Sequence, residues 1–119
     1  MGLINSFIKM LNVDDASNVS KSDKYARAEK LFYMGRDAAI RDDNQAAIRY
    51  YKESIALRED PAPIQGLAAV YIEEHRDREA LELFEKAKRM RIKICPSDPE
   101  IATCNLMIAM IKNNYGKKI

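Results

Sequence analysis

The side chains best suited to chemistry in this chain of 119 residues are one histidine and two cysteines. His75, the only histidine, falls in a predicted turn, and neither a Ser-His-Asp nor a Cys-His arrangement is evident around it. Cys95 and Cys104 are separated by eight residues, which is not a spacing typical of zinc ligands. These residues therefore predict neither a catalytic site nor a metal site.

Cofactor binding and export are not indicated either. The chain has no glycine-rich loop that could hold a phosphate, and its acidic pairs at 42–43 and 73–74 fit solvated turns. Two cysteines are too few for a disulfide framework and indicate free thiols in a reducing compartment. No apolar run is long enough to cross a bilayer, and no secretory signal is present. We therefore expect a cytoplasmic protein without a cofactor that is not an enzyme.

Helices must position the remaining side chains, because apolar residues recur every three or four positions along most of the chain. Ser22 or Asp23 is the expected N-cap of the first long helix, and the pattern Ser97-Asp98-Pro99-Glu100 predicts a capping box for the last. Short connections make consecutive helices antiparallel, so the predicted fold class is all-α. The predicted helices span residues 24–40, 46–58, 61–74, 78–94 and 99–113.

The stretch between Ala28 and Ile94 repeats itself at an offset of 33 residues. The residue pairs that mark this repeat are Gly35/Ala68, Ala47/Ala80, Tyr51/Phe84 and Ser54/Ala87. Repetition at this spacing is typical of stacked supersecondary units and favours a binding scaffold over an enzyme.

The repeated residues resemble the tetratricopeptide-repeat family, whose signature is W-x2-L-G-x2-Y followed by A-x3-F. The two units read Leu31-x2-Met34-Gly35-x2-Ala38 with Ala47-x3-Tyr51, and Ile64-x2-Leu67-Ala68-x2-Tyr71 with Ala80-x3-Phe84. A partial third copy, Thr103-x2-Leu106-Met107-x2-Met110, follows the second at an offset of 39 residues. No tryptophan opens a unit, and the period is 33 rather than 34. The resemblance implies a short right-handed α-solenoid of antiparallel helix pairs.

In that family the first helices of the units line a concave groove that takes a partner's peptide or helix. The resemblance places these residues on the groove wall: Glu29, Phe32, Arg36 and Ala39; Ala62, Gln65, Ala69 and Ile72; Ile101, Cys104, Ile108 and Ile111. Because Arg36 is their only cation, we expect an apolar strand or amphipathic helix rather than a terminal carboxylate. For Phe32, Ile108 and Ile111 the alternative is burial in the core.

Residues 1–12 form a predicted amphipathic helix, joined by a flexible linker, 13–23, to the helical domain 24–119. Its apolar face consists of Leu3, Ile4, Phe7, Ile8 and Leu11. A helix of this length is marginal alone, so this face needs a surface to lie on. That surface is either the protein's own domain, a second copy in a homodimer, or a membrane contacted peripherally.

Charge gives weaker indications about partners. The net charge is +2, but from Lys86 onward there are 8 Lys and Arg against 2 Asp and Glu. Cations suit the end of a helix, and no nucleic-acid motif accompanies them, so nucleic acid is not an expected partner. The sequence thus predicts an adaptor or chaperone-type scaffold for a protein or peptide partner. The alternative is a membrane-surface or self-assembling component attached through residues 2–11.

Overall fold

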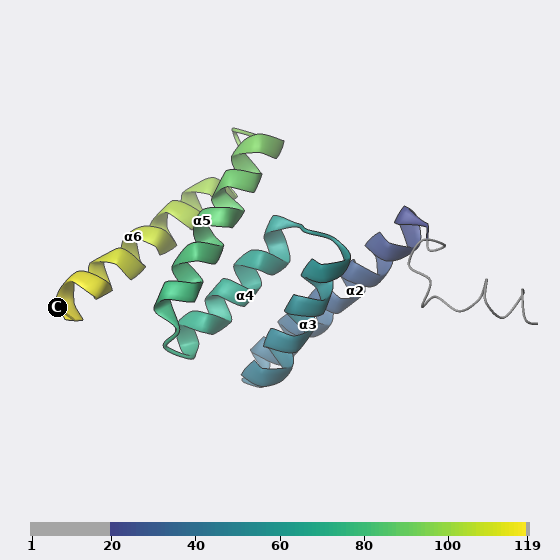
Figure 1. The fold of residues 1–119 in the computed structure, drawn as a ribbon, viewed down its shortest axis with the longest axis horizontal. Coiled ribbons are helices and arrows are strands. Elements are labelled where there is room, and N and C mark those ends of the chain that lie inside the picture. Colours follow the sequence, from purple (N-terminus) through teal and green to yellow (C-terminus); the bar gives the residue numbers. More distant parts are fainter. Residues whose placement is uncertain (1–19, 119) are drawn as a thin grey trace, which may run out of the picture.

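The computed structural model describes residues 20–118, which form five helices and no strand. They are α2 (Lys21–Ile40), α3 (Asn44–Leu57), α4 (Pro61–Glu73), α5 (Asp77–Ile94) and α6 (Glu100–Lys118). Each helix packs against the next along the chain, and Figure 1 shows them following one another in a row. The predicted all-α fold and the order of its helices are confirmed.

Local capping explains where three of these helices begin. The Ser20 hydroxyl accepts a hydrogen bond from the Asp23 N–H at 3.1 Å and caps α2. The helix therefore begins before Ser22 and Asp23, the two predicted N-caps. The side chain of Asp43 accepts from the Ala46 N–H in the same way, and α3 therefore starts at Asn44. Asp60 caps α4, and Pro61 stands in its first turn, as the sequence predicts.

The last helix differs from its prediction at both ends. Asp98, not Ser97, provides the cap, because its Oδ1 accepts the Glu100 N–H at 2.9 Å. The helix then continues through Lys118 instead of ending near Asn113. The predicted linker 13–23 likewise ends too late, since α2 begins at Lys21. The rest of that linker and the predicted helix 1–12 lie outside the described residues.

The two helix pairs α2–α3 and α4–α5 repeat the same turn. Asp42 and His75, 33 residues apart, both have a φ of 60°, a left-handed conformation that is uncommon outside glycine. The following N–H groups bond back to equivalent carbonyls: Asp43 to Ala38 at 2.9 Å, and Arg76 to Tyr71 at 2.8 Å. The sequence repeat is therefore also a repeat of backbone geometry.

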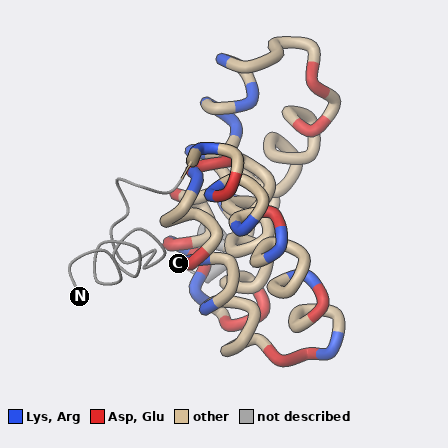
Figure 2. Tube along the Cα trace, turned by 90° about the vertical axis from the view of Figure 1, so that its right-hand side faces the viewer, with Lys and Arg blue, Asp and Glu red and all other residues tan. Residues whose placement is uncertain are grey.

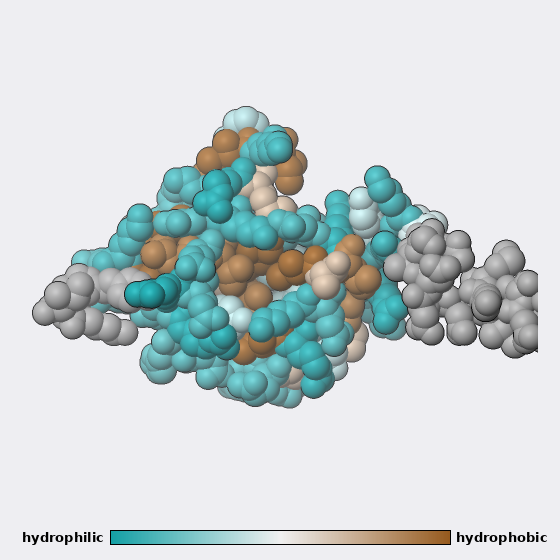
Figure 3. Space-filling view, in the orientation of Figure 1, coloured by the Kyte–Doolittle hydropathy of each residue, from teal (hydrophilic) through white to brown (hydrophobic). Residues whose placement is uncertain are grey.

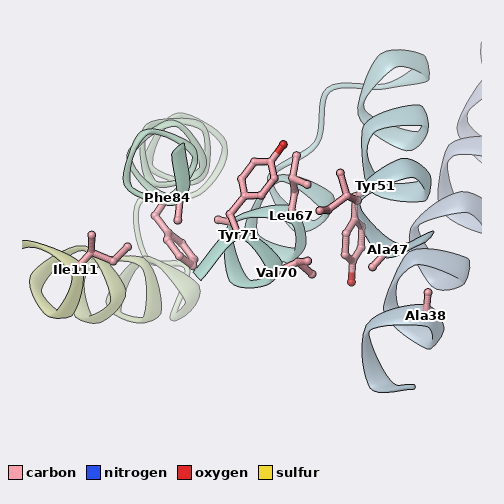
Figure 4. Packing of buried hydrophobic residues seen from close by; sticks show 11 residues of the cluster. Ala38, Ala47, Tyr51, Leu67, Val70, Tyr71, Phe84 and Ile111 are labelled. Atoms are coloured by element: carbon pink, nitrogen blue, oxygen red, sulfur yellow. The ribbon is translucent and has the colours of Figure 1, made fainter. Parts of the chain in front are cut away.

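All four residue pairs that mark the repeat are buried. Tyr51 lies against Gly35, and Phe84 and Ala68 are buried in the same core cluster. Figure 4 shows Tyr51 beside Ala47 and Val70, and Phe84 between Tyr71 and Ile111. In both pairs a small residue of the first helix and an aromatic residue of the second are thus buried in the core.

Tyr51 also packs against the following pair, because its ring lies between two glycines. A Cβ atom on Gly35 of α2 would stand 2.8 Å from the Tyr51 ring, and one on Gly66 of α4 would stand 2.6 Å from it. Nearby, the buried Ser54 hydroxyl donates a hydrogen bond of 2.7 Å to the Ala28 carbonyl and ties α3 to α2. These close approaches fix α2, α3 and α4 relative to one another.

Candidate functional site

The predicted wall residues of the third unit occupy a different face of α6 from the one expected. Cys104 and Ile111 are 0% and 3% exposed and pack against α4 and α5, and Ile101 and Ile108 are half-buried. Their side chains thus pack against other helices of the same chain and line none of the hollows described below. The prediction that Cys104 and Ile111 face a partner is therefore wrong, and the alternative of core packing holds for Ile111.

The reason is that the sequence analysis aligned the third unit with the second at an offset that is one residue too long. The caps give the correct alignment: Asp60 binds the Ala62 N–H through Oδ1, and Asp98 binds the Glu100 N–H through Oδ1, an offset of 38 rather than 39. At this offset the buried Cys104 corresponds to Gly66, which faces the preceding helix pair. The positions equivalent to the wall of α4 are then Glu100, Thr103, Met107 and Met110, a less apolar set than predicted.

The predicted walls of the first two units do meet, in a pocket of about 200 Å³ between α2 and α4. Glu29 and Phe32 of α2 and Ala62 of α4 all line it, with Pro63 beside Ala62. Tyr25 and Tyr33, whose exposed fractions are 39% and 43%, supply further aromatic surface. Side chains 33 residues apart in the chain thus form one hollow.

The rim of this pocket is charged on both sides. Arg58 lies over the Tyr25 ring, 4.1 Å from its centre, and its Nε is 4.0 Å from a carboxylate oxygen of Asp60. A cation over an aromatic ring contributes about 0.5–1 kcal/mol at an exposed site, so Arg58 holds this wall in place. Glu29 adds an exposed carboxylate on the α2 side. The pocket can therefore accept one apolar or aromatic side chain with polar groups on either side of it.

The remaining predicted wall residues vary in exposure. Arg36 and Ala69 are exposed, whereas Ala39 and Ile72 are half-buried against the core. Phe32 is also half-buried, with its ring centre 6.0 Å from that of Tyr51. The open part of the wall is thus confined to the α2–α4 pocket and the exposed positions beside it.

Gln65, another predicted wall residue, is already engaged within the protein. Its Nε2 donates to Glu100 of α6 at 3.3 Å, and its Oε1 accepts from Arg91 Nε. Arg91 also pairs with Asp98 at 3.0 Å, where the two side chains are only 15% and 22% exposed. These four side chains connect α4, α5 and the start of α6, so Gln65 has a structural role.

A second hollow, which the sequence did not reveal, lies between α3 and α5 above α4. It measures about 560 Å³, with Leu67, Tyr71 and Leu83 among its lining residues and charged side chains of α3 and α5 around them. Figure 4 shows Leu67 and Tyr71 pointing into the space between these helices. Figure 3 shows hydrophobic residues gathered in the middle of a molecular face with hydrophilic margins. This hollow exists because α3 and α5 stand apart on either side of α4. A pattern within one helix cannot predict such a separation.

The two thiols have opposite surroundings, and this predicts selective labelling. Burial raises the pKa of the Cys104 thiol, whereas Cys95 is exposed. We expect a thiol reagent such as DTNB to modify Cys95 at once in the folded protein, and Cys104 only as fast as the α5–α6 contact opens. The Cys95→Ser variant should retain only the slow phase. Rapid modification of both thiols would contradict the burial of Cys104.

Within residues 20–118, no group of His, Cys, Asp and Glu side chains is arranged to hold a metal ion. None of the described helices combines the length and apolarity needed to cross a membrane. The predicted self-association or membrane residues Leu3, Ile4, Phe7, Ile8 and Leu11 lie outside the described part of the chain.

Comparisons with protein-family models, with curated proteins and with solved structures found no significant match.

Proposed function

We propose that this protein is a short tetratricopeptide-like array that binds an apolar segment of a partner protein, as an adaptor or chaperone-type module. The observation that supports it is the α2–α4 pocket, in which Glu29, Phe32 and Ala62 occupy wall positions of successive units. Apolar side chains of a bound peptide gain affinity from such pockets, while extended or helical backbone sets the spacing between them.

The corrected wall positions of α6 limit the kind of partner that this surface fits. A continuous apolar wall across three units would favour a long hydrophobic helix, but Glu100 and Thr103 now follow Gln65 along the wall. Polar residues therefore interrupt the apolar wall at the start of α6, and only Met107 and Met110 continue it there. A partner with one aromatic or aliphatic anchor residue, flanked by polar residues, fits this distribution better than a uniformly apolar helix.

A selection from random displayed peptides tests this proposal on the full chain. We expect enriched peptides to share an apolar anchor and to bind about tenfold more weakly to Ala62→Glu, because a charged side chain would enter the pocket. Ala56→Glu is the matched control, since Ala56 is exposed on α3 and outside the pocket. Affinity is measured by anisotropy of a labelled peptide.

Circular dichroism shows whether both variants keep their helical content. Equal affinity of the wild type and a folded Ala62→Glu variant would rule out this pocket as the binding site. Ala69→Glu then measures how far the bound segment extends, because Ala69 is exposed further along α4.

A further inference from the structure

The α2–α4 pocket contains one charged side chain that the described part of the protein leaves unpaired. The charged residues that line this pocket are Glu29, Arg58 and Asp60. Arg58 lies over the Tyr25 ring and beside the Asp60 carboxylate. Asp60 also accepts the N–H that begins α4, so both of these charges are engaged. Among residues 20–118, no side chain pairs with the Glu29 carboxylate.

The surroundings of Glu29 explain why its carboxylate stays unpaired. Tyr25 and Tyr33 stand four residues before and after it on α2, where a helical ion pair would need a cation. The residues three positions away on either side are also uncharged. Ala62 and Pro63 line the α4 side of the same pocket. An exposed carboxylate thus lies among uncharged side chains at the place where the apolar anchor of a partner would enter.

We propose that this pocket selects a partner segment in which a lysine or arginine stands next to the apolar anchor, and that Glu29 binds this cation. The inference rests on the proposed peptide-binding function and adds the chemical class of the residue beside the anchor. A basic residue there would pair with a carboxylate that has no other partner in the described chain. An acidic residue would be repelled by Glu29, and Arg58 already has Asp60 as its partner.

The two exposed tyrosines of the pocket also favour a basic residue. The cations beside them, Arg36 and Arg58, lie over the rings of Tyr33 and Tyr25, at 4.9 and 4.1 Å from the ring centres. These arginines are thus directed to the rings and not to Glu29. The aliphatic stem of an incoming lysine or arginine can lie on the same aromatic surface while its charged end reaches the carboxylate.

The overall charge of the molecule does not favour a basic partner. The net charge is +2, and Figure 2 shows acidic and basic residues interspersed along the described helices. The attraction is therefore local to Glu29, and salt screens it beyond about 8 Å at physiological ionic strength. We expect a lysine or arginine within one or two residues of the anchor to strengthen binding, and one further away to have little effect.

Fluorescence anisotropy on the full chain tests the proposal with three labelled peptides. They share an anchor sequence from the selection and differ only in the two residues that flank the anchor, which are both Lys, both Gln or both Glu. The lysine peptide should bind about threefold more tightly than the glutamine peptide, and the glutamate peptide about threefold more weakly, as is usual for an exposed ion pair. These differences should shrink at 0.5 M salt and in Glu29→Gln, and the order should reverse in Glu29→Lys.

Glu53→Lys is the matched control for the charge reversal. Glu53 is exposed on α3 and outside the pocket, so this variant changes the net charge as much as Glu29→Lys does. It should keep the wild-type order of the three peptides, and circular dichroism checks that both variants are folded. A reversal in Glu53→Lys as well would attribute the preference to net charge and overturn the role of Glu29.

The other outcomes separate this inference from the proposal on which it rests. Three peptides that bind the wild type equally, yet weaken with Ala62→Glu, overturn the role of Glu29 and leave the peptide-binding proposal intact. A wild-type preference for the glutamate peptide would assign the pocket to an acidic segment and overturn the inference in the same way. Peptides that are insensitive to Ala62→Glu overturn both.

Discussion

Gly66→Ala is expected to destabilise the protein by about 1–3 kcal/mol, even though alanine favours helices over glycine. The added Cβ would lie 2.6 Å from Cζ of Tyr51, and the ring cannot retreat, because Gly35 borders it on the other side. Either the ring or α4 must move, and both belong to the central core. Urea denaturation of the wild type and the variant measures the difference in the free energy of unfolding.

The double variant Tyr51→Ala with Gly66→Ala shows whether the ring is the cause. Removing the ring costs stability by itself, but alanine at position 66 should then stabilise by about 0.5–1 kcal/mol relative to glycine, its usual preference in a helix. The effect of Gly66→Ala on the free energy of unfolding should therefore change sign when the Tyr51 ring is removed. If alanine destabilised equally with and without the ring, the close packing of Tyr51 on Gly66 would not be responsible.

Arg91→Met should cost about 2 kcal/mol, because it removes the hydrogen bonds that join α5 to Gln65 and to Asp98. Breaking a fully buried ion pair costs more, but these side chains are 15% and 22% exposed, so solvent screens the loss. Methionine retains most of the packing of the arginine stem. Thermal and urea denaturation give the change in stability.

Arg76→Met is the matched control for that substitution. Arg76 pairs with Glu79 at 2.6 Å and lies over the Tyr71 ring, but the side chains of the pair are 41% and 49% exposed, so solvent screens it and its loss should cost less than the loss of the Arg91 contacts. Equal losses in the two variants would mean that the Arg91 contacts do not join the helices more strongly than an ordinary surface pair.

Acid titration provides a second measurement of the contact between Arg91 and Asp98. The Glu100 N–H, followed by Arg91, holds the pKa of Asp98 below its usual range. Because the folded pKa lies below the unfolded one, ionised Asp98 stabilises the protein above about pH 4, and this stabilisation is lost as the pH falls through the folded value. The wild type should therefore lose more stability than Asp98→Asn as the pH falls below about 4, and parallel losses would contradict this contribution.

The first two helix pairs could be predicted from sequence because their signals agree. Gly35 and Ala68, Tyr51 and Phe84, and the turns at 41–45 and 75–77 all recur at one offset, and the structure buries the paired residues as expected. Side-chain size and backbone capping point to the same alignment there. Such agreement leaves little freedom for a shifted register.

In α6 the signals disagree, and apolarity alone chose the wrong face. This helix carries Leu106 and Met110 on one side and Cys104 and Ile111 on the other, so two registers satisfy the same helical spacing. The Asp98-Pro99 pair, which matches Asp60-Pro61, was the local signal that could have decided between them. Gly66 was also missed, because its importance comes from the Tyr51 ring of another helix.

The position of α4 in the row has a consequence for how this protein loses its structure. It is the only described helix that touches the helices on both sides and also α2, and seven of its residues are buried. Helices at the two ends of the row have fewer neighbours, so they should fray in local openings while α4 stays intact. Amide protons of α4 should therefore exchange with solvent most slowly, and unfolding should proceed inward from both ends of the row.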